Sequence, residues 1–242
     1  MTDDLPASVR GLFRLGSAAF AVLLALVVAS AVTAPISGLA VRAGLVVEDG
    51  NGWQILRTVL QFGGFLLAVL VYFVITDEWD LLRISRLSAR DAALVVIAGI
   101  GLLLLQYAAL IGLQSAGLGT AQNQATVPGG DPVAYYLAMV AVSVLVVGPV
   151  EELLFRGVVQ GGLRRAFDAA PAILLASVLF GLIHLPGIEG STGEQWAYVG
   201  VVVGLGCVLG VLYERTNNVL IPGLAHGIYN AAIYVVLLIN SL

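Results

Sequence analysis

The sequence predicts an all-α fold, a polytopic transmembrane helix bundle of about seven spans. Of its 242 residues, 60% are hydrophobic and only 11% are charged, whereas a soluble domain is about a quarter charged. The apolar residues are gathered into long runs, and a helix needs about 20 apolar residues to cross the hydrocarbon layer of a bilayer. Short polar segments with turn-forming residues separate these runs. Water therefore cannot be the main solvent of this chain.

Seven apolar runs have the length of a membrane span, and an eighth, less distinct helix is left open. The first, from Ser17 to Leu39, is too long for the core of a cleaved signal peptide, so we expect it to be retained. The others are Ile55 to Ile75, Ala92 to Ile111, Val133 onward through the pair Glu151 and Glu152, Pro171 to Leu185, Trp196 to Tyr213 and Val219 to Leu238. The long outer segment from Gln114 to Pro132, rich in Gly, Gln and Thr, is interpreted as an unstructured linker rather than a cover over the outer mouth.

The arginines predict the orientation, because basic residues in short loops are retained on the cytoplasmic side. Those at the ends of the spans fall mostly on one side: Arg10, Arg14, Arg83, Arg86, Arg90, Arg164, Arg165 and Arg215. The other side has only Arg42 and Arg57. We therefore expect an integral, multi-pass membrane protein with a cytoplasmic N-terminus and an external C-terminus. The absence of lysine and the richness in Ala, Val and Gly favour a prokaryotic cell membrane.

Charge and cysteine content exclude two classes of function. The net charge is −4 and no basic stripe is present, so no nucleic-acid partner is expected. The one cysteine, Cys207, lies in an apolar run and can form neither an internal disulfide nor a thiolate metal site. It is interpreted as a small buried apolar residue.

Ionisable and amide side chains inside the apolar runs are the candidate functional residues. A charged group at the middle of a transmembrane helix costs about 2.5–3.5 kcal/mol on insertion scales, so each one is a functional hypothesis. They form three groups: Glu151, Glu152 and Arg156; His184; and His226 with Asn230. At ~1.5 Å of rise per residue, Glu151, His184 and Asn230 lie at similar depths, about 18–21 Å from the arginine-rich side. The three groups are therefore expected to meet in one buried site.

Helical spacing predicts which of these side chains share a face. Glu152 and Arg156 are four residues apart and carry opposite charges, so they should pair. Glu151 then points about 100° away and is free to face a cavity, with the pair supporting it. His226 and Asn230, also four apart, can both donate hydrogen bonds to an oxyanion. One carboxylate, two imidazoles and an amide supply a general base, a proton shuttle and oxyanion donors; the alternative is a purely structural polar network between helices.

The motifs Glu151-Glu152-x-x-x-Arg156, Phe180-x-x-x-His184 and His226-x-x-x-Asn230 resemble, in this order, those of the CAAX protease and bacteriocin-processing (CPBP) family. That family includes CAAX prenyl endopeptidases of the Ras-converting type and bacteriocin-processing or immunity-associated membrane proteases. The resemblance covers residues 133–232. It divides the chain into N-terminal spans one to three with their loops, residues 1–132, and a catalytic helix domain, residues 133–242.

The resemblance implies an intramembrane endopeptidase whose helices surround a cytoplasm-facing cavity. Glu151 and His184 would activate water, and His226 and Asn230 would hold the oxyanion. Family members are often described as metalloproteases, and Glu151, His184 and His226 are a plausible Zn²⁺ set, with water as a further ligand. No His-Glu-x-x-His helix is present, so the commonest zinc-protease geometry is absent. We therefore favour catalysis without a metal or other cofactor.

Two other classes of function remain open from the residues. A proton-coupled transporter also uses buried Glu and His, although paired interrupted segments in the two halves, which would support it, do not stand out. A catalytically silent scaffold or immunity protein would use the same fold to hold a partner. The serine–histidine pair of rhomboids and the intramembrane aspartate pair of presenilin-like enzymes are missing. The expected partners are the lipid bilayer and a peptide or protein substrate, prenylated or otherwise membrane-associated.

Overall fold

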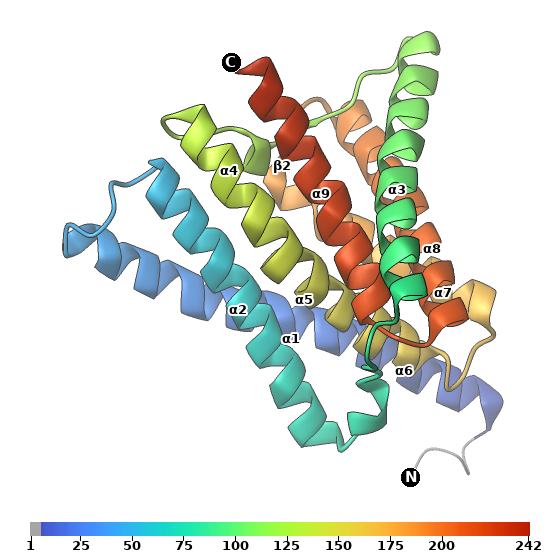
Figure 1. Cartoon of the computed structure of the whole chain (residues 1–242). Helices are drawn as coiled ribbons and strands as arrows, with labels where there is room; N and C mark the ends of the chain where they lie inside the picture. Colours follow the sequence, from blue (N-terminus) through green and yellow to red (C-terminus); the bar gives the residue numbers. More distant parts are fainter. Residues whose placement is uncertain (1–5) are drawn as a thin grey trace.

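The computed structural model describes residues 6–242 and confirms the all-α polytopic bundle. Seven helices in this part of the chain are long and apolar enough to cross a membrane, so the molecule is an integral, multi-pass membrane protein. They are α1 (Ala7–Arg42), α2 (Asn51–Thr76), α3 (Ala89–Ser115), the span Pro132–Leu163, α7 (Ala169–Leu182) with the short η5 (Leu185–Gly187), α8 (Thr192–Thr216) and α9 (Leu220–Asn240). Figure 1 shows them as one bundle, which α1 crosses obliquely.

Polar side chains determine where several of these helices begin and end. Ser88 and Ser191 each accept a hydrogen bond from the third helical residue, and the acidic side chain of that residue, Asp91 or Glu194, bonds back to the serine backbone. These capping boxes satisfy backbone N–H groups that a helix start leaves unpaired. Asn217 ends α8 in the left-handed region at φ 50°, which an asparagine tolerates better than most residues.

The first helix is longer than the apolar run predicts. It begins at Ala7 rather than Ser17, so Arg10 and Arg14 lie inside it instead of preceding it. The Arg14 guanidinium is buried and binds the Glu78 carboxylate, which in turn accepts hydrogen bonds from Tyr72 and Arg165. Because tertiary partners compensate the charge, the helix continues through residues whose polarity predicts a loop.

The fourth span departs from α-helical hydrogen bonding in two places. It consists of α4 (Pro132–Val142), the π-helical η3 (Ser143–Val147), α5 (Gly148–Glu152), the π-helical η4 (Leu153–Gln160) and α6 (Gly161–Leu163). A π-helical turn is rare and is frequent at functional sites. Here the two π-helical segments flank the short helix that carries the glutamate pair.

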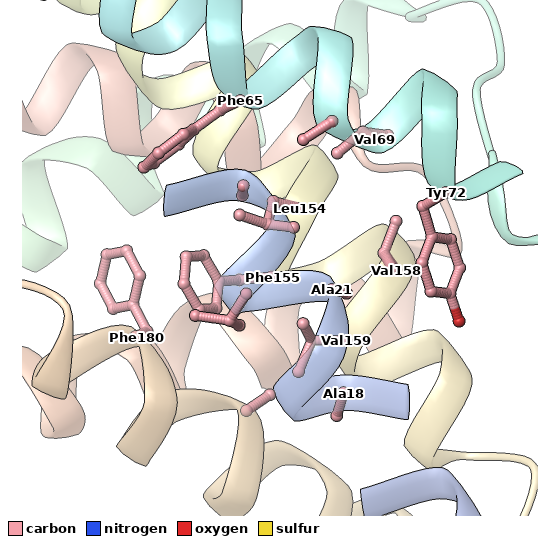
Figure 2. Packing of buried hydrophobic residues seen from close by; sticks show 14 of the residues in the cluster. Ala18, Ala21, Phe65, Val69, Tyr72, Leu154, Phe155, Val158, Val159 and Phe180 are labelled. Atoms are coloured by element: carbon pink, nitrogen blue, oxygen red, sulfur yellow. The ribbon is translucent and has the colours of Figure 1, made fainter. Parts of the chain in front are cut away.

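The largest buried apolar cluster surrounds η4 (Figure 2). Its members include Leu154, Phe155, Val158 and Val159 of η4, Ala18 and Ala21 of α1, Phe65, Val69 and Tyr72 of α2, and Phe180 of α7. The rings of Phe155 and Phe180 meet edge to face, with centroids 5.1 Å apart, a favoured aromatic geometry. This cluster ties the glutamate-bearing span to the helix that carries His184.

Glycines allow α5 and α9 to touch backbone to backbone. A methyl group on Gly148 would overlap the carbonyl oxygen of Gly223 and the backbone of Gly227. A methyl group on Gly227 would in turn lie 2.8 Å from the carbonyl oxygen of Ser143. Small residues of this kind permit close helix contacts in membranes, where van der Waals packing drives association. The contact holds the glutamate pair against the histidine of α9.

Replacing Gly148 by alanine is expected to destabilise the bundle by about 1–3 kcal/mol, the usual range for overpacking. The change acts by forcing α5 and α9 apart. The measurement is the thermal unfolding midpoint in detergent. Gly101→Ala on α3 is the matched control, since nothing lies within 4 Å of the added methyl group. Equal behaviour of the two variants would contradict the close-contact explanation.

The two ends of the bundle differ. The arginine-rich end consists of the start of α1 and the segments 77–88, 164–168 and 217–219. The opposite end, called the ribbon end after its two-stranded β-ribbon, consists of the segments 43–50, 116–131 and 183–191. At the ribbon end β1 (Gln122–Asn123) pairs antiparallel with β2 (Ile188–Glu189), next to the 3-10 turn η2 (Gln124–Thr126). Another 3-10 turn, η1 (Trp79–Leu81), lies at the arginine-rich end. In Figure 1 the ribbon end, with the C-terminus, is uppermost.

The segment from Gln114 to Pro132 is not the unstructured linker that its composition predicts. The hydroxyls of Tyr135 and Tyr234 both donate to the carbonyl of Ala125, each at 2.9 Å. Gln54 of α2 donates to the carbonyl of Val127. These partners come from three different helices, so the order of the segment depends on tertiary contacts that its own residues do not indicate.

Candidate active site

The four predicted site residues line one cavity of about 830 Å³. Glu151 reaches it from α5, His184 from the end of α7, and His226 and Asn230 from α9. Its wall also includes Phe180, Tyr198 and Tyr229. The three separate motifs therefore contribute side chains to the same cavity in this structure.

Glu152 and Arg156 lie behind the cavity wall and form the predicted pair. Both are fully buried, and Arg156 Nε donates to Glu152 Oε2 at 2.8 Å. The other carboxylate oxygen of Glu152 lies 3.1 Å from His226 Nδ1. One carboxylate thus joins the guanidinium on its own helix to the imidazole of α9. A histidine hydrogen-bonded in this way has its ring orientation determined by that partner.

The Arg156 guanidinium occupies a polar pocket between the fourth span, α7 and α8. Its Nη1 donates to Gln160 Oε1 and to Ser177 Oγ, both at 3.3 Å. Gly206 and Gly210 of α8 make room for it, because a methyl group at either position would lie 3.2–3.3 Å from a guanidinium nitrogen. Several hydrogen bonds compensate the buried charge, as such a charge requires.

Glu151 faces the cavity instead of the Arg156 pocket. Its Oε2 lies 3.7 Å from His226 Nε2, beyond direct hydrogen-bonding distance. Successive helical residues point about 100° apart, so the adjacent glutamates contact opposite sides of one imidazole. Nε2 of His226 is consequently the ring atom that faces the cavity beside Glu151.

His184 lies just past the end of α7, with its ring against Phe180. Its Nδ1 is 2.8 Å from the carbonyl oxygen of Phe180. Since a carbonyl can only accept, this contact requires the proton on Nδ1, and in neutral imidazole Nε2 is then an acceptor. The arrangement makes His184 suited to receive a proton from a group in the cavity.

Asn230 and two tyrosines complete the polar lining. Among the described residues the amide of Asn230 has no hydrogen-bond partner, so it is available to a molecule in the cavity. The Tyr229 hydroxyl donates to Gln106 of α3, and the Tyr198 hydroxyl accepts from Asn123 of the β1–β2 ribbon. Sequence reasoning missed these residues, although Gln106 inside an apolar run was a detectable signal.

The predicted alternative zinc set does not fit this arrangement. In residues 6–242 no three His, Cys, Asp or Glu side chains are grouped so that they could hold a metal ion. The hydrogen bonds on Nδ1 of His226 and of His184 leave each Nε2 free, as in a zinc-binding histidine, so the disagreement with a zinc site lies in the spacing of the three side chains.

Comparison with known proteins finds one similarity. The protein-family model described as "Rce1-like: Type II CAAX prenyl endopeptidase Rce1-like" matches residues 133–232. This stretch begins in α4, includes all three motifs and ends in α9. No curated protein and no solved structure matches the chain.

Proposed function

Because residues 133–232 belong to the Rce1-like family of type II CAAX prenyl endopeptidases, we propose that this chain is an intramembrane endopeptidase that works through Glu151, His184, His226 and Asn230. Membership implies a protease that acts on a peptide or protein in a membrane environment. The observation that carries the assignment of residues is the 3.7 Å approach of Glu151 to His226 in the wall of a cavity that His184 and Asn230 also line.

In the proposed reaction a water molecule occupies the cavity between Glu151 and His184. The Glu151 carboxylate takes a proton from the water, whose oxygen attacks the carbonyl carbon of the scissile peptide bond. His184 Nε2 accepts a second hydrogen bond from the same water and holds it in place. When the intermediate breaks down, the proton on Glu151 passes to the departing amine, and the other product is a carboxylic acid. A positioned general base of this kind contributes about 10²–10⁴-fold in rate.

His226 and Asn230 would stabilise the oxygen of the intermediate. With protons on both ring nitrogens, His226 donates through Nδ1 to Glu152 and through Nε2 to the oxyanion. The Asn230 amide, which no described side chain engages, supplies the second donor. Removing one such donor from an oxyanion site typically costs about 10²–10³-fold in kcat.

We also propose catalysis without a metal. Purified protein dialysed against a chelator should cleave a fluorogenic peptide library as fast as the untreated protein, to within about twofold. Mass spectrometry of the fragments identifies the bonds cleaved, and a mock purification from cells that lack the protein reports contaminating proteases. Loss of cleavage on chelation with recovery on adding Zn²⁺ would overturn the metal-free mechanism and leave the endopeptidase assignment intact.

We also propose a cytoplasmic N-terminus in a prokaryotic cell membrane, and a division of the chain into residues 1–132 and a catalytic helix domain, residues 133–242. No specific observation in the described residues favours the transporter alternative. Proton or solute flux that depends on Glu151, measured in proteoliposomes without any peptide cleavage, would favour it over the protease.

A further inference from the structure

Most of the residues that line the cavity lie in the half of the bundle nearest the ribbon end. Helices α2, α4 and α8 begin at that end, and the cavity is lined by their early residues, including Trp53, Gln54, Tyr135 and Tyr198. Helix α9 ends there, and its lining residues extend from His226 toward the C-terminus as far as Tyr234. The segment 120–126 contributes every one of its residues to the wall. The cavity therefore lies on the ribbon-end side of the glutamate pair.

The other half of the bundle is filled. Glu152, Arg156 and Gln160 are fully buried, as are Phe155, Val159 and Leu163 on the way to the arginine-rich end. None of these side chains lines the cavity. A peptide could not reach Glu151 from the arginine-rich end without displacing this core.

Arginine placement identifies which compartment each end faces. The arginine-rich end and the helix turns that adjoin it carry Arg10, Arg14, Arg83, Arg86, Arg90, Arg164, Arg165 and Arg215. The ribbon end has Arg42 and Arg57. The connecting segments are short, which is the condition under which basic residues determine topology. The arginine-rich end is accordingly expected in the cytoplasm.

Arg57, one of the two exceptions, has a different explanation. Its guanidinium lies over the Trp53 ring, 4.3 Å from the centroid, and both residues line the cavity. No carboxylate of residues 6–242 pairs with it. A basic residue in the cavity wall is available to a ligand, so its position has a reason other than membrane orientation. Arg42 then remains as the single counterexample.

Two sequence expectations thus conflict. A cytoplasmic N-terminus and a cytoplasm-facing cavity cannot both hold, because the cavity lies toward the end of the bundle opposite the start of α1. The first expectation comes from the charges of this chain, whereas the second comes only from the resemblance. We propose that the cavity opens to the extracytoplasmic side, and that the substrates are peptide segments exposed there, on secreted or membrane proteins. The proposed orientation does not depend on the proposed function, whereas the substrate class rests on it.

Cysteine labelling tests the orientation without requiring activity. In a Cys207→Ala background, single variants Glu48→Cys and Glu189→Cys place a thiol at exposed positions of the ribbon end, and Ile84→Cys places one at an exposed position of the arginine-rich end. Intact bacterial cells are treated with a membrane-impermeant maleimide. The first two variants should be labelled in intact cells and Ile84→Cys only after permeabilisation. The reverse pattern would overturn the proposal.

Vesicles of defined sidedness test the substrate class. The probe is the best-cleaved peptide of the library, carrying a sulfonated dye so that it cannot cross the bilayer. Cleavage is expected in right-side-out vesicles, with less than about one tenth of that rate in inside-out vesicles before detergent is added. Cleavage only in inside-out vesicles would overturn the extracytoplasmic cavity while supporting the endopeptidase. If neither kind of vesicle cleaved the peptide, even in detergent, the proposed function and the substrate class would both be overturned. The orientation would still be decided by the cysteine labelling.

Discussion

Peptide cleavage by Glu151→Gln is expected to fall by about 10²–10⁴-fold, the contribution of a positioned general base. Glutamine has nearly the same shape, but its amide cannot take a proton from water. Glu151 forms no ion pair with Arg156 and is bordered by the cavity, so the fold should tolerate the change. The measurement is kcat/KM for the fluorogenic peptide, with the thermal unfolding midpoint of each preparation alongside.

Glu189→Gln is the matched control for this variant. Glu189 is an exposed carboxylate on β2, close along the chain to His184 but outside the cavity lining. Its replacement should leave kcat/KM within about twofold of the unmodified protein. A Glu151→Gln protein that is folded and cleaves at an unchanged rate would exclude the proposed mechanism.

Replacing Arg156 by methionine is expected to destabilise the protein by about 3–5 kcal/mol, as when one partner of a buried ion pair is removed. Methionine fills part of the volume but leaves the fully buried Glu152 carboxylate without its guanidinium. The unfolding free energy in detergent, or the yield of folded protein, measures the loss. Cleavage should also fall, because Glu152 positions His226.

Two comparisons isolate the effect of the buried charge. The double variant Glu152→Gln with Arg156→Met removes both charges and should recover part of the lost stability. Arg164→Met breaks the partly exposed pair with Glu214, at 3.2 Å, and should cost less than about 1 kcal/mol. If Arg164→Met destabilised the protein as much as Arg156→Met, burial would not be the reason for the effect.

Much of the fold follows from hydropathy because each span must satisfy its own backbone in lipid. The number and order of the seven spans were predictable for this reason. The early start of α1 was not, because it depends on Glu78, a residue 64 positions beyond Arg14. The ordered segment 116–131 was missed for the same kind of reason: the tyrosines that bind it belong to α4 and α9.

The candidate site was predictable where spacing along one helix decides it. The pair Glu152–Arg156 follows from a separation of four residues, and the rarity of charges in apolar runs singled out the three motifs. The contact between Glu152 and His226 joins residues 74 positions apart, and no local rule predicts it. Counting residues along each helix predicted that the motifs lie at a similar depth in the membrane. It could not predict which half of the bundle contains the cavity, because that depends on how the large side chains pack in the other half.

The π-helical segment η4 has a consequence for how this span can vary in length. Glu152, Arg156 and Gln160 follow one another at intervals of four, and Arg156 bonds to both neighbours. Four residues make just over one turn of an α-helix and just under one turn of a π-helix, so side chains four apart lie on the same side of this span. Inserting or deleting a single residue between Glu152 and Gln160 would rotate the residues beyond it by about 100°, so the contacts of this stretch with α8 depend on its number of residues as well as on its side chains.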